Sequence, residues 1–193
     1  MRALDNRAMK RKIIYGFGMT IDGYIARKDD SMDYLKMTKE GEAVMMEFFS
    51  KIDTIVMGRR TFTVSRALQK EENTPEMPGM VNYVFSRSMK PGKRKGYEVV
   101  RGPLKPFVAR LRARKGKDIY LAGGGQLARS FLRADLVDEL FIGLVPIMLG
   151  DGLSAFPPSF PQRDFKLTEC KAYADGSIAL RYARVRSKPH RAK

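Results

Sequence analysis

Two glycine-containing segments constrain the fold of this chain more than any other feature. In residues 54–62 (TIVMGRRTF) and in residues 118–126 (DIYLAGGGQ), a short apolar run meets glycine and continues as a helix-like stretch. A strand that turns through glycine into a helix is typical of α/β proteins. Glycine lets the backbone approach a ligand closely, and the free N–H groups and dipole of a helix N-terminus attract anions. One such turn is equally typical of an ordinary connection, but two together favour a site for both ends of a dinucleotide.

The spacing of apolar residues predicts an α/β sheet that is mostly parallel in its central part. Helical spacing occurs in residues 42–49, 104–111 and 125–134. Strands that alternate with helices imply parallel pairing. Near the end of the chain, Asp175 and Gly176 separate two alternating runs, which indicates an antiparallel hairpin. Strand-like runs rich in apolar, β-branched and aromatic residues lie at residues 12–19, 52–57, 80–86, 97–100, 117–122 and 137–145.

Size and composition are those of one globular domain. The 193 residues are 44% hydrophobic and 30% charged, which suits a single core. We expect a flexible basic N-terminus at residues 1–11, one domain at 12–186 and a basic tail at 187–193, with mobile connections at 69–79 and 90–96. No apolar run approaches the roughly 18 residues of a membrane span, and no secretory signal is evident, so we expect a cytoplasmic protein.

The scarcity of histidine excludes several classes of active site. His190, in the basic tail, is the single histidine. A Ser-His-Asp triad and a histidine-ligated metal centre are therefore excluded, and we expect no metal. A proton donor would have to be Asp, Glu, Tyr, Lys or water.

The formal net charge of +16 is the one feature that favours a polyanionic partner. Strongly basic domains often bind nucleic acid. Here the positive residues are scattered, with clusters at residues 10–12, 93–95 and 110–117 and in the tail, and aromatic residues do not interleave with them. We therefore favour a solvated basic surface over a specific nucleic-acid function.

Six short motifs, taken in order, resemble the dihydrofolate reductase-like superfamily. The resemblance runs from about residue 13 to residue 185 and is greatest for the branch that holds the reductase domain of bifunctional riboflavin-biosynthesis proteins and many small stand-alone reductases. It implies an α/β three-layer fold with a mostly parallel central sheet and a C-terminal antiparallel hairpin. The motifs are residues 19–26 (MTIDGYIA), 55–62 (IVMGRRTF), 83–88 (YVFSRS), 121–126 (LAGGGQ), 136–140 (LVDEL) and 145–152 (VPIMLGDG).

The resemblance implies NADPH as the cofactor. In such proteins the two glycine turns embrace the pyrophosphate, and a serine-bearing strand end lies by the adenosine 2′-phosphate. Arg59 and Arg87 suit charge-assisted hydrogen bonds to that dianion, which NADH lacks, although Arg87 is also consistent with a solvated loop charge. The residues assigned to the cofactor are Gly18, Ile25, Gly58, Arg59, Arg60, Thr61, Ser86, Arg87, Gly123, Gly124, Gly125, Gln126 and Leu127.

The resemblance also points to Glu42 and Asp22 as catalytic residues. Dihydrofolate reductases carry a carboxylate on the first helix, and counting back from the first glycine turn reaches Glu42, although insertions would move the role to Asp33. A buried carboxyl group at position 42 would hold its proton firmly, as an acid needs. Asp22 matches an aspartate that faces the substrate in riboflavin-type reductases, as an acid or a ribityl ligand. The alternatives are a solvated first-turn glutamate, a turn aspartate and a proton donated by water.

Departures from the family pattern argue against dihydrofolate as the substrate. Met80 matches the arginine that clasps the glutamate of folate, and methionine cannot make that bidentate pair. The chain has no tryptophan, and Tyr34 is the nearest substitute for the active-site tryptophan of the family. The chain also lacks the zinc ligands of the deaminase that accompanies the riboflavin-type reductase.

We therefore expect an NADPH-dependent reductase that transfers a hydride to a small heterocyclic or carbonyl substrate. The substrate would resemble 5-amino-6-ribosylaminopyrimidinone or a pterin. The alternatives are a catalytically inactive nucleotide-binding protein of the same fold and dihydrofolate reductase proper. Proteins with this resemblance are often homodimers, and residues 136–149 are apolar enough to lie in such an interface.

Overall fold

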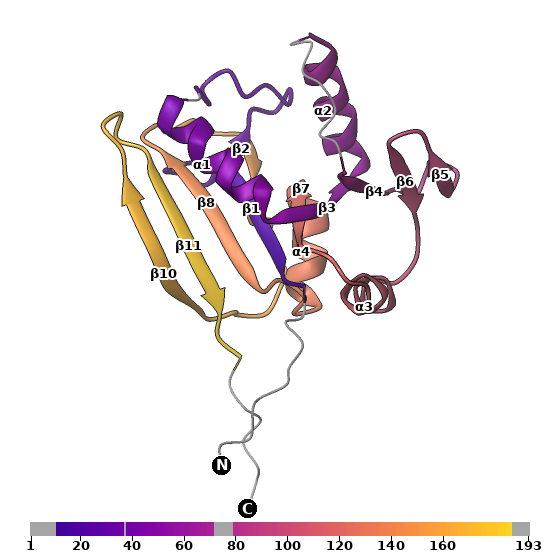
Figure 1. The fold of residues 1–193 in the computed structure, drawn as a ribbon. Coiled ribbons are helices and arrows are strands. Elements are labelled where there is room, and N and C mark those ends of the chain that lie inside the picture. The colour runs from indigo at the N-terminus through magenta and orange to yellow at the C-terminus, as the bar shows by residue number, and fades with distance from the viewer. Residues whose placement is uncertain (1–10, 37, 72–78, 187–193) are drawn as a thin grey trace, which may run out of the picture.

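The chain forms a nine-stranded sheet with helices on both faces (Figure 1). The computed structural model describes residues 11–36, 38–71 and 79–186. The helices are α1 (Lys39–Ser50), α2 (Arg59–Glu71), α3 (Leu104–Ala113) and α4 (Gly125–Arg133). The strands are β1 (Ile13–Thr20), β2 (Tyr24–Ala26), β3 (Ile52–Gly58), β4 (Val81–Phe85), β5 (Gly92–Arg94), β6 (Tyr97–Val100), β7 (Asp118–Gly123), β8 (Glu139–Val145), β9 (Leu153–Ser154), β10 (Phe165–Ala172) and β11 (Ile178–Arg184).

The strand order confirms the predicted mostly parallel sheet with a C-terminal hairpin. Strands follow the order β10-β11-β8-β1-β7-β3-β4-β6-β5, and every pair from β8 to β6 is parallel. β10 and β11 pair antiparallel on either side of the turn that contains Asp175 and Gly176. β2 and β9 form a separate two-stranded sheet. The parallel strands therefore all end at one edge of the sheet, where ligands bind in open α/β folds.

Two apolar layers cover the two faces of the sheet. In β1, Ile13 and Tyr15 pack with Phe131 of α4, whereas Ile14 packs with Phe48 of α1. Each of these five side chains is at most 3% exposed. Burial of each contributes roughly 1.5–3 kcal/mol, which explains why this central strand is apolar on both faces. The alternation fixes the register of the strand and hence the position of its carboxyl end.

Several short elements differ from the sequence-based expectation. β5 lies within residues 90–96, which we expected to be a mobile connection, and α2 continues to Glu71, inside the expected loop 69–79. β5 and β9 have two or three residues each and owe their form to pairing with a neighbour, so they leave no apolar pattern in the sequence. Residues 1–10, 72–78 and 187–193, including His190, lie outside the described ranges.

Arg11 belongs to the folded domain and not to the flexible N-terminus in which we expected it. Its side chain is 6% exposed, and its guanidinium donates to the carboxylate of Asp53 and to the hydroxyl of Thr54. A buried cation requires such a partner, because desolvation of an unpaired charge is costly. The ordered domain therefore begins at least one residue earlier than predicted.

Residues 136–149 lie mainly inside the molecule. β8 is an inner strand between β1 and β11, and side chains such as Leu140, Phe141 and Ile142 are buried in the core. Only the end of the segment is open, where Ile147 is 36% and Met148 is 71% exposed. Most of the apolar character of this segment thus reflects the core, and its exposed end at Ile147 and Met148 is the part that remains open to a partner.

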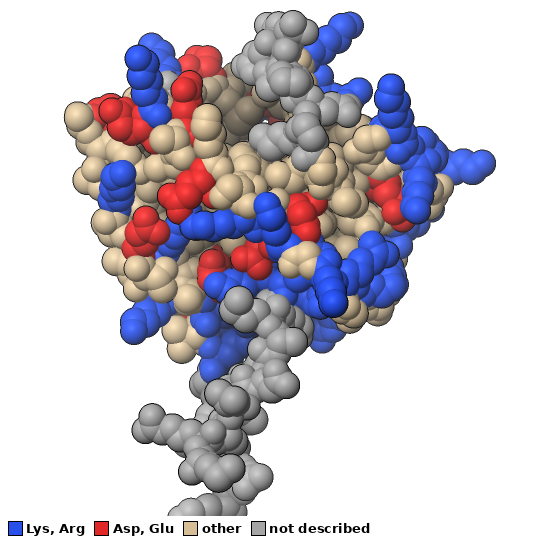
Figure 2. All heavy atoms as spheres, in the orientation of Figure 1, with Lys and Arg blue, Asp and Glu red and all other residues tan. Residues whose placement is uncertain are grey.

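The basic side chains are spread over the surface and many of them meet carboxylates. Figure 2 shows Lys and Arg interspersed with Asp and Glu over the face displayed. Asp135 alone forms ion pairs with Arg163, Arg184 and Arg186. No helix of the described ranges has the length and apolar character needed to cross a bilayer.

Candidate functional site

The two glycine turns lie side by side at the carboxyl edge of the sheet. β3 and β7 are neighbours, with Met57 in register with Gly123. A Cβ built on Gly58 would lie 3.7 Å from the carbonyl oxygen of Gly123 and 3.9 Å from the nitrogen of Gly124. A Cβ built on Gly124 would lie 3.2 Å from Oγ1 of Thr61. The turns are therefore in close contact, with the backbone of Gly58 near that of Gly123 and Gly124 and the Thr61 side chain against Gly124.

The three glycines of the second turn serve different needs. Gly123 has a φ of +90°, which favours glycine, and its peptide bond to Gly124 is cis. A Cβ on Gly125 would lie 2.6 Å from the carbonyl oxygen of Ser154 and 2.8 Å from Cγ of Pro157, so this glycine is required by packing. At Gly124 the absence of a side chain leaves room for the hydroxyl of Thr61.

The N-termini of α2 and α4 can accept an anion. Neither helix has an acidic residue in its first turn, and no described side chain caps the N-terminus of α4 at Gly124. By contrast, α1 is capped by Thr38, whose hydroxyl accepts a hydrogen bond of 3.1 Å from the nitrogen of Gly41, and it carries Glu40 and Glu42 in its first turn. Free N–H groups and an unopposed helix dipole fit the phosphates of a dinucleotide.

Three arginines near these turns differ in availability. Arg60 donates to Asp30 at 2.7 Å and to the carbonyl oxygen of Lys28 at 3.2 Å, so it ties α2 to the segment after β2. Arg59 and Arg87 are exposed, and neither forms an ion pair with any residue of the described ranges. Arg59 and Arg87 are therefore free to pair with a ligand, whereas Arg60 is occupied.

The turn after β4 is braced by hydrogen bonds. The buried hydroxyl of Ser86 accepts from the nitrogens of Ser88 at 3.3 Å and Met89 at 3.0 Å. Arg101 donates to the carbonyl oxygens of Arg87 and Met89. Ser86 thus shapes the turn that carries Arg87. Arg101 is a supporting residue that sequence reasoning missed, because its partners lie in another strand connection.

The carboxylate of Asp22 connects two segments at the carboxyl edge of the sheet, the end of β1 and the loop at residues 149–150. It accepts hydrogen bonds from the hydroxyl of Thr20 and from the nitrogens of Leu149 at 3.0 Å and Gly150 at 2.7 Å. The bond from Thr20, with those from Gly150 and Leu149, lowers the pKa of the Asp22 carboxyl below its ordinary value. An ionised carboxylate has no proton to donate, so this geometry suits Asp22 to positioning the loop at residues 149–150 and not to acid catalysis.

The other carboxylates proposed from the sequence have different surroundings. Glu42 is exposed in the first turn of α1, and its carboxylate has no partner among the described residues. Its exposure matches the alternative of a solvated first-turn glutamate, which the sequence left open. Asp33 forms an ion pair with Arg27, whose Nε lies 2.8 Å from Oδ1, and this hydrogen bond lowers the pKa of Asp33. Glu42 is therefore the one of the three candidates whose carboxyl group is not held by another side chain or by a main-chain N–H.

Three further residues that the sequence assigns to the cofactor lie near the glycine turns, in the elements that flank them: Gly18, Ile25 and Leu127. A Cβ on Gly18 would lie 3.1 Å from a methyl group of Leu35, so Leu35 fills the space over this strand position. Ile25 is half-buried in β2, and Leu127 lies in the first turn of α4 beside Gly58. Gln126 is exposed at the start of the same helix.

Comparison with known proteins decides the family. The model of the RibD C-terminal domain matches residues 11–179. The chain belongs to the RibD C-terminal domain family. The uncharacterized protein YwjB of Bacillus subtilis (strain 168) is 30% identical to this RibD C-terminal domain over 180 residues, which cover 92% of this chain and 100% of YwjB.

Solved structures agree with the RibD C-terminal fold. A putative riboflavin biosynthesis protein from Shewanella sp. PV-4 matches with a TM-score of 0.79 and 26% identity, over 91% of this chain and 99% of that chain. Dihydrofolate reductase from Enterococcus faecalis, solved with NADP(H), matches with a TM-score of 0.61 and 13% identity, over 90% of this chain and 96% of that one. The second match shows the shared fold alone. The predicted superfamily and its riboflavin-reductase branch are thus confirmed, and they support a reductase-like role for this RibD C-terminal domain.

Within the described ranges, no group of three or more His, Cys, Asp or Glu side chains could hold a metal ion. The candidate site combines the two glycine turns, the exposed Arg59 and Arg87, the turn held by Ser86 and the carboxylates Asp22 and Glu42.

Proposed function

We propose that the chain is an NADPH-dependent reductase that transfers a hydride to a small heterocyclic or carbonyl substrate. The observation that carries this proposal is the contact between the two glycine turns, which brings the N-termini of α2 and α4 to one edge of the sheet. The similar proteins named as a riboflavin biosynthesis protein and as dihydrofolate reductase with NADP(H) support it.

The proposed cofactor site divides into a pyrophosphate part and a 2′-phosphate part. Main-chain N–H groups at Gly58 to Thr61 and at Gly124 to Gln126 would bind the pyrophosphate. Arg59 and Arg87 would pair with the 2′-phosphate, because both are exposed and lack ion-pair partners among the described residues. The nicotinamide would supply the hydride, and the protein would orient it and exclude water.

The proposed substrate is not dihydrofolate. Met80 is half-buried and packs against the apolar cluster under α1, so it presents no charge to a carboxylate. A substrate similar to 5-amino-6-ribosylaminopyrimidinone or to a pterin fits the proposal. Asp22 would position the loop at residues 149–150 beside that substrate, and Glu42, or water in its place, would supply the proton.

Cofactor binding and turnover test this function together. The purified protein is titrated with NADPH and NADH, and NADPH oxidation is followed by absorbance with ribosylaminopyrimidinone, pterins and dihydrofolate. We expect NADPH to bind at micromolar concentrations and one of the first two substrate types to be reduced. Absence of nucleotide binding would refute the reductase proposal, binding without turnover would favour an inactive nucleotide-binding protein, and rapid turnover of dihydrofolate would contradict our use of Met80.

Glu42→Gln is expected to lower the turnover rate about tenfold without changing NADPH affinity. The effect is modest for an acid because solvent can partly replace an exposed donor. Glu40→Gln, in the same first turn, is the matched control and should leave the rate unchanged. Equal rates for the Glu42 and Glu40 variants would show that water is the proton donor.

Asp22→Asn should instead raise the KM for the substrate, since it disturbs the hydrogen bonds to Leu149 and Gly150.

We propose a second copy of the chain as the partner. The supporting feature is a cluster of exposed apolar side chains at Ile21, Ile147 and Met148, in which the nitrogen of Ile21 donates to the carbonyl oxygen of Ile147 at 2.9 Å. Light scattering should give the mass of a dimer, and Met148→Glu should shift it to that of a monomer. A monomer at micromolar concentration would contradict this proposal. A cytoplasmic location and the absence of a nucleic-acid function stay predictions.

A further inference from the structure

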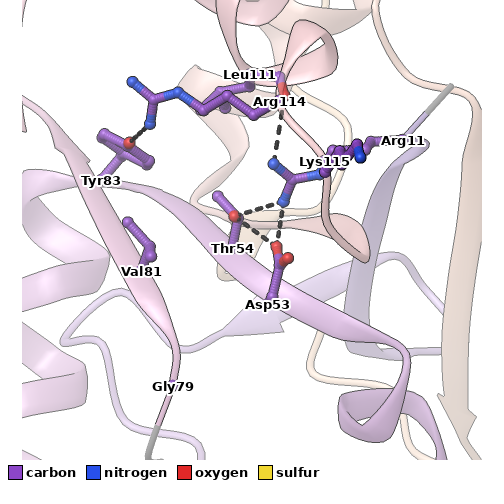
Figure 3. A pocket seen from close by; sticks show the side chains of 9 residues that line it. All are labelled: Arg11, Asp53, Thr54, Gly79, Val81, Tyr83, Leu111, Arg114 and Lys115. Carbon is purple, nitrogen blue, oxygen red and sulfur yellow. Dashed lines mark hydrogen bonds and ion pairs between the residues drawn. The ribbon is translucent and has the colours of Figure 1, made fainter.

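A cavity lies at the opposite edge of the sheet from the glycine turns. It has a volume of about 160 Å³ and opens between the amino ends of β3 and β4 and the chain that leads from α3 to β7 (Figure 3). Its lining residues are Arg11, Asp53, Thr54, Gly79, Val81, Tyr83, Leu111, Arg114 and Lys115. Three of these are cations and one is a carboxylate, so the cavity is net positive.

One wall of the cavity is a closed hydrogen-bond network around Arg11. Its guanidinium donates to Asp53, to Thr54 at 2.7 Å and to the carbonyl oxygens of Leu111 at 3.3 Å and Lys117 at 2.5 Å. Asp53 also accepts from the nitrogen of Lys117 at 2.7 Å. The single carboxylate is therefore neutralised by its own partners, and it does not oppose an incoming anion.

The other wall presents donors that lack acceptors. Tyr83 is 5% exposed, and its hydroxyl oxygen accepts a hydrogen bond of 2.9 Å from Nη1 of Arg114, as Figure 3 shows. The hydroxyl proton of Tyr83 meets no acceptor among the described residues. Lys115 likewise forms no hydrogen bond or ion pair within the described ranges. Among the described residues, the hydroxyl proton of Tyr83 and the ammonium group of Lys115 thus have no acceptor, and Arg114 lies beside them.

The rim of the cavity is shaped by close backbone contact. A Cβ on Gly116 would overlap the carboxylate of Asp53 and would lie 3.1 Å from Cζ of Arg11. Only glycine lets the chain after Lys115 wrap this closely around the buried ion pair. The backbone that carries Arg114 and Lys115 therefore lies close against the Arg11–Asp53 ion pair.

We propose that this cavity binds a phosphate group, either free phosphate or the phosphate of a small monoester. The cavity of about 160 Å³ has room for a small anion such as phosphate. Arg114 and Lys115 would neutralise the charge, and the hydroxyl of Tyr83 would donate to one oxygen. The site is separate from the proposed cofactor site and does not rest on it.

Titration of the full-length, ¹⁵N-labelled protein with inorganic phosphate tests the proposal. We expect a dissociation constant of about 1 mM or lower, with shifts of the main-chain amides of Thr54 and Gly116. Tyr83→Phe and Lys115→Gln should each weaken binding about tenfold. Arg110→Gln, an exposed cation of α3 that does not line the cavity, is the matched control and should leave binding unchanged.

The double variant Arg59→Ala/Arg87→Ala separates the two anion sites. Unchanged phosphate affinity in this variant would support binding in the cavity. Loss of affinity, or chemical-shift changes confined to the amides of Gly58 and Gly124, would overturn the proposal. No binding up to about 10 mM phosphate at constant ionic strength, or equal binding by Tyr83→Phe, Lys115→Gln and the control, would also overturn it. Methyl phosphate that produces the same shifts indicates an esterified ligand, and binding of free phosphate alone indicates inorganic phosphate.

Discussion

Gly124→Val is expected to weaken NADPH binding about a hundredfold or more, which corresponds to a loss of about 2.7 kcal/mol. A Cβ at this position would already lie 3.2 Å from the hydroxyl oxygen of Thr61. The two further methyl groups of valine would stand in front of the adjoining turns, where the pyrophosphate must approach main-chain N–H groups closely. Titration of NADPH fluorescence measures the change.

A valine added far from the turns is the control for this result. Ala172→Val, on the exposed end of β10, should leave NADPH affinity unchanged. Thermal unfolding of both variants shows whether they remain folded. A folded Gly124→Val protein that binds NADPH as tightly as the unchanged protein would mean that the glycine turns do not face the cofactor.

The double replacement Arg59→Ala/Arg87→Ala is expected to lower NADPH affinity about a hundredfold and to leave NADH affinity nearly unchanged. Each guanidinium would contribute roughly 1.5 kcal/mol or more through a hydrogen bond to a charged group, or about tenfold. NADH lacks the 2′-phosphate and would lose none of this. Parallel titrations with the two nucleotides give the ratio.

Arg60→Ala is the matched control for that ratio, because Arg60 lies next to Arg59 but pairs with Asp30. It should leave the preference for NADPH unchanged and cost at most about 1 kcal/mol of folding stability, as exposed ion pairs do. If the double variant weakens NADH and NADPH equally, the two arginines do not recognise the 2′-phosphate.

The main strands of the fold were predictable because the apolar pattern along the chain has a physical cause. β1, β3 and β7 are inner strands whose side chains are buried or half-buried on both faces, so their apolar runs are long and end at glycine or at polar residues. The edge strand β5 contains Gly, Lys and Arg, and pairing with β6 alone determines its form. The residue types of such a strand do not distinguish it from a loop.

The sequence suggests candidate residues for the site, but it does not show which of them already have partners in the folded chain. Arg59 and Arg60 are adjacent and chemically identical, and only the folded chain shows that Asp30 occupies one of them. Asp22 follows a pattern typical of a turn aspartate, but its decisive partners, Leu149 and Gly150, lie 127 and 128 residues away. The exposure of Glu42 likewise depends on how α1 packs on the sheet. Long-range contacts of this kind decide protonation and pairing, and local sequence does not contain them.

The contact between the two glycine turns has a consequence for how relatives of this chain can diverge. The pyrophosphate part of the proposed site uses main-chain atoms of two neighbouring turns, so replacements of side chains other than the turn glycines, Arg59 and Arg87 would leave cofactor binding largely intact. The substrate half uses side chains and loops, such as Asp22 with residues 149–150, where a single replacement alters shape or charge. Relatives with this arrangement would therefore keep the same hydride donor, while the substrates that accept the hydride differ.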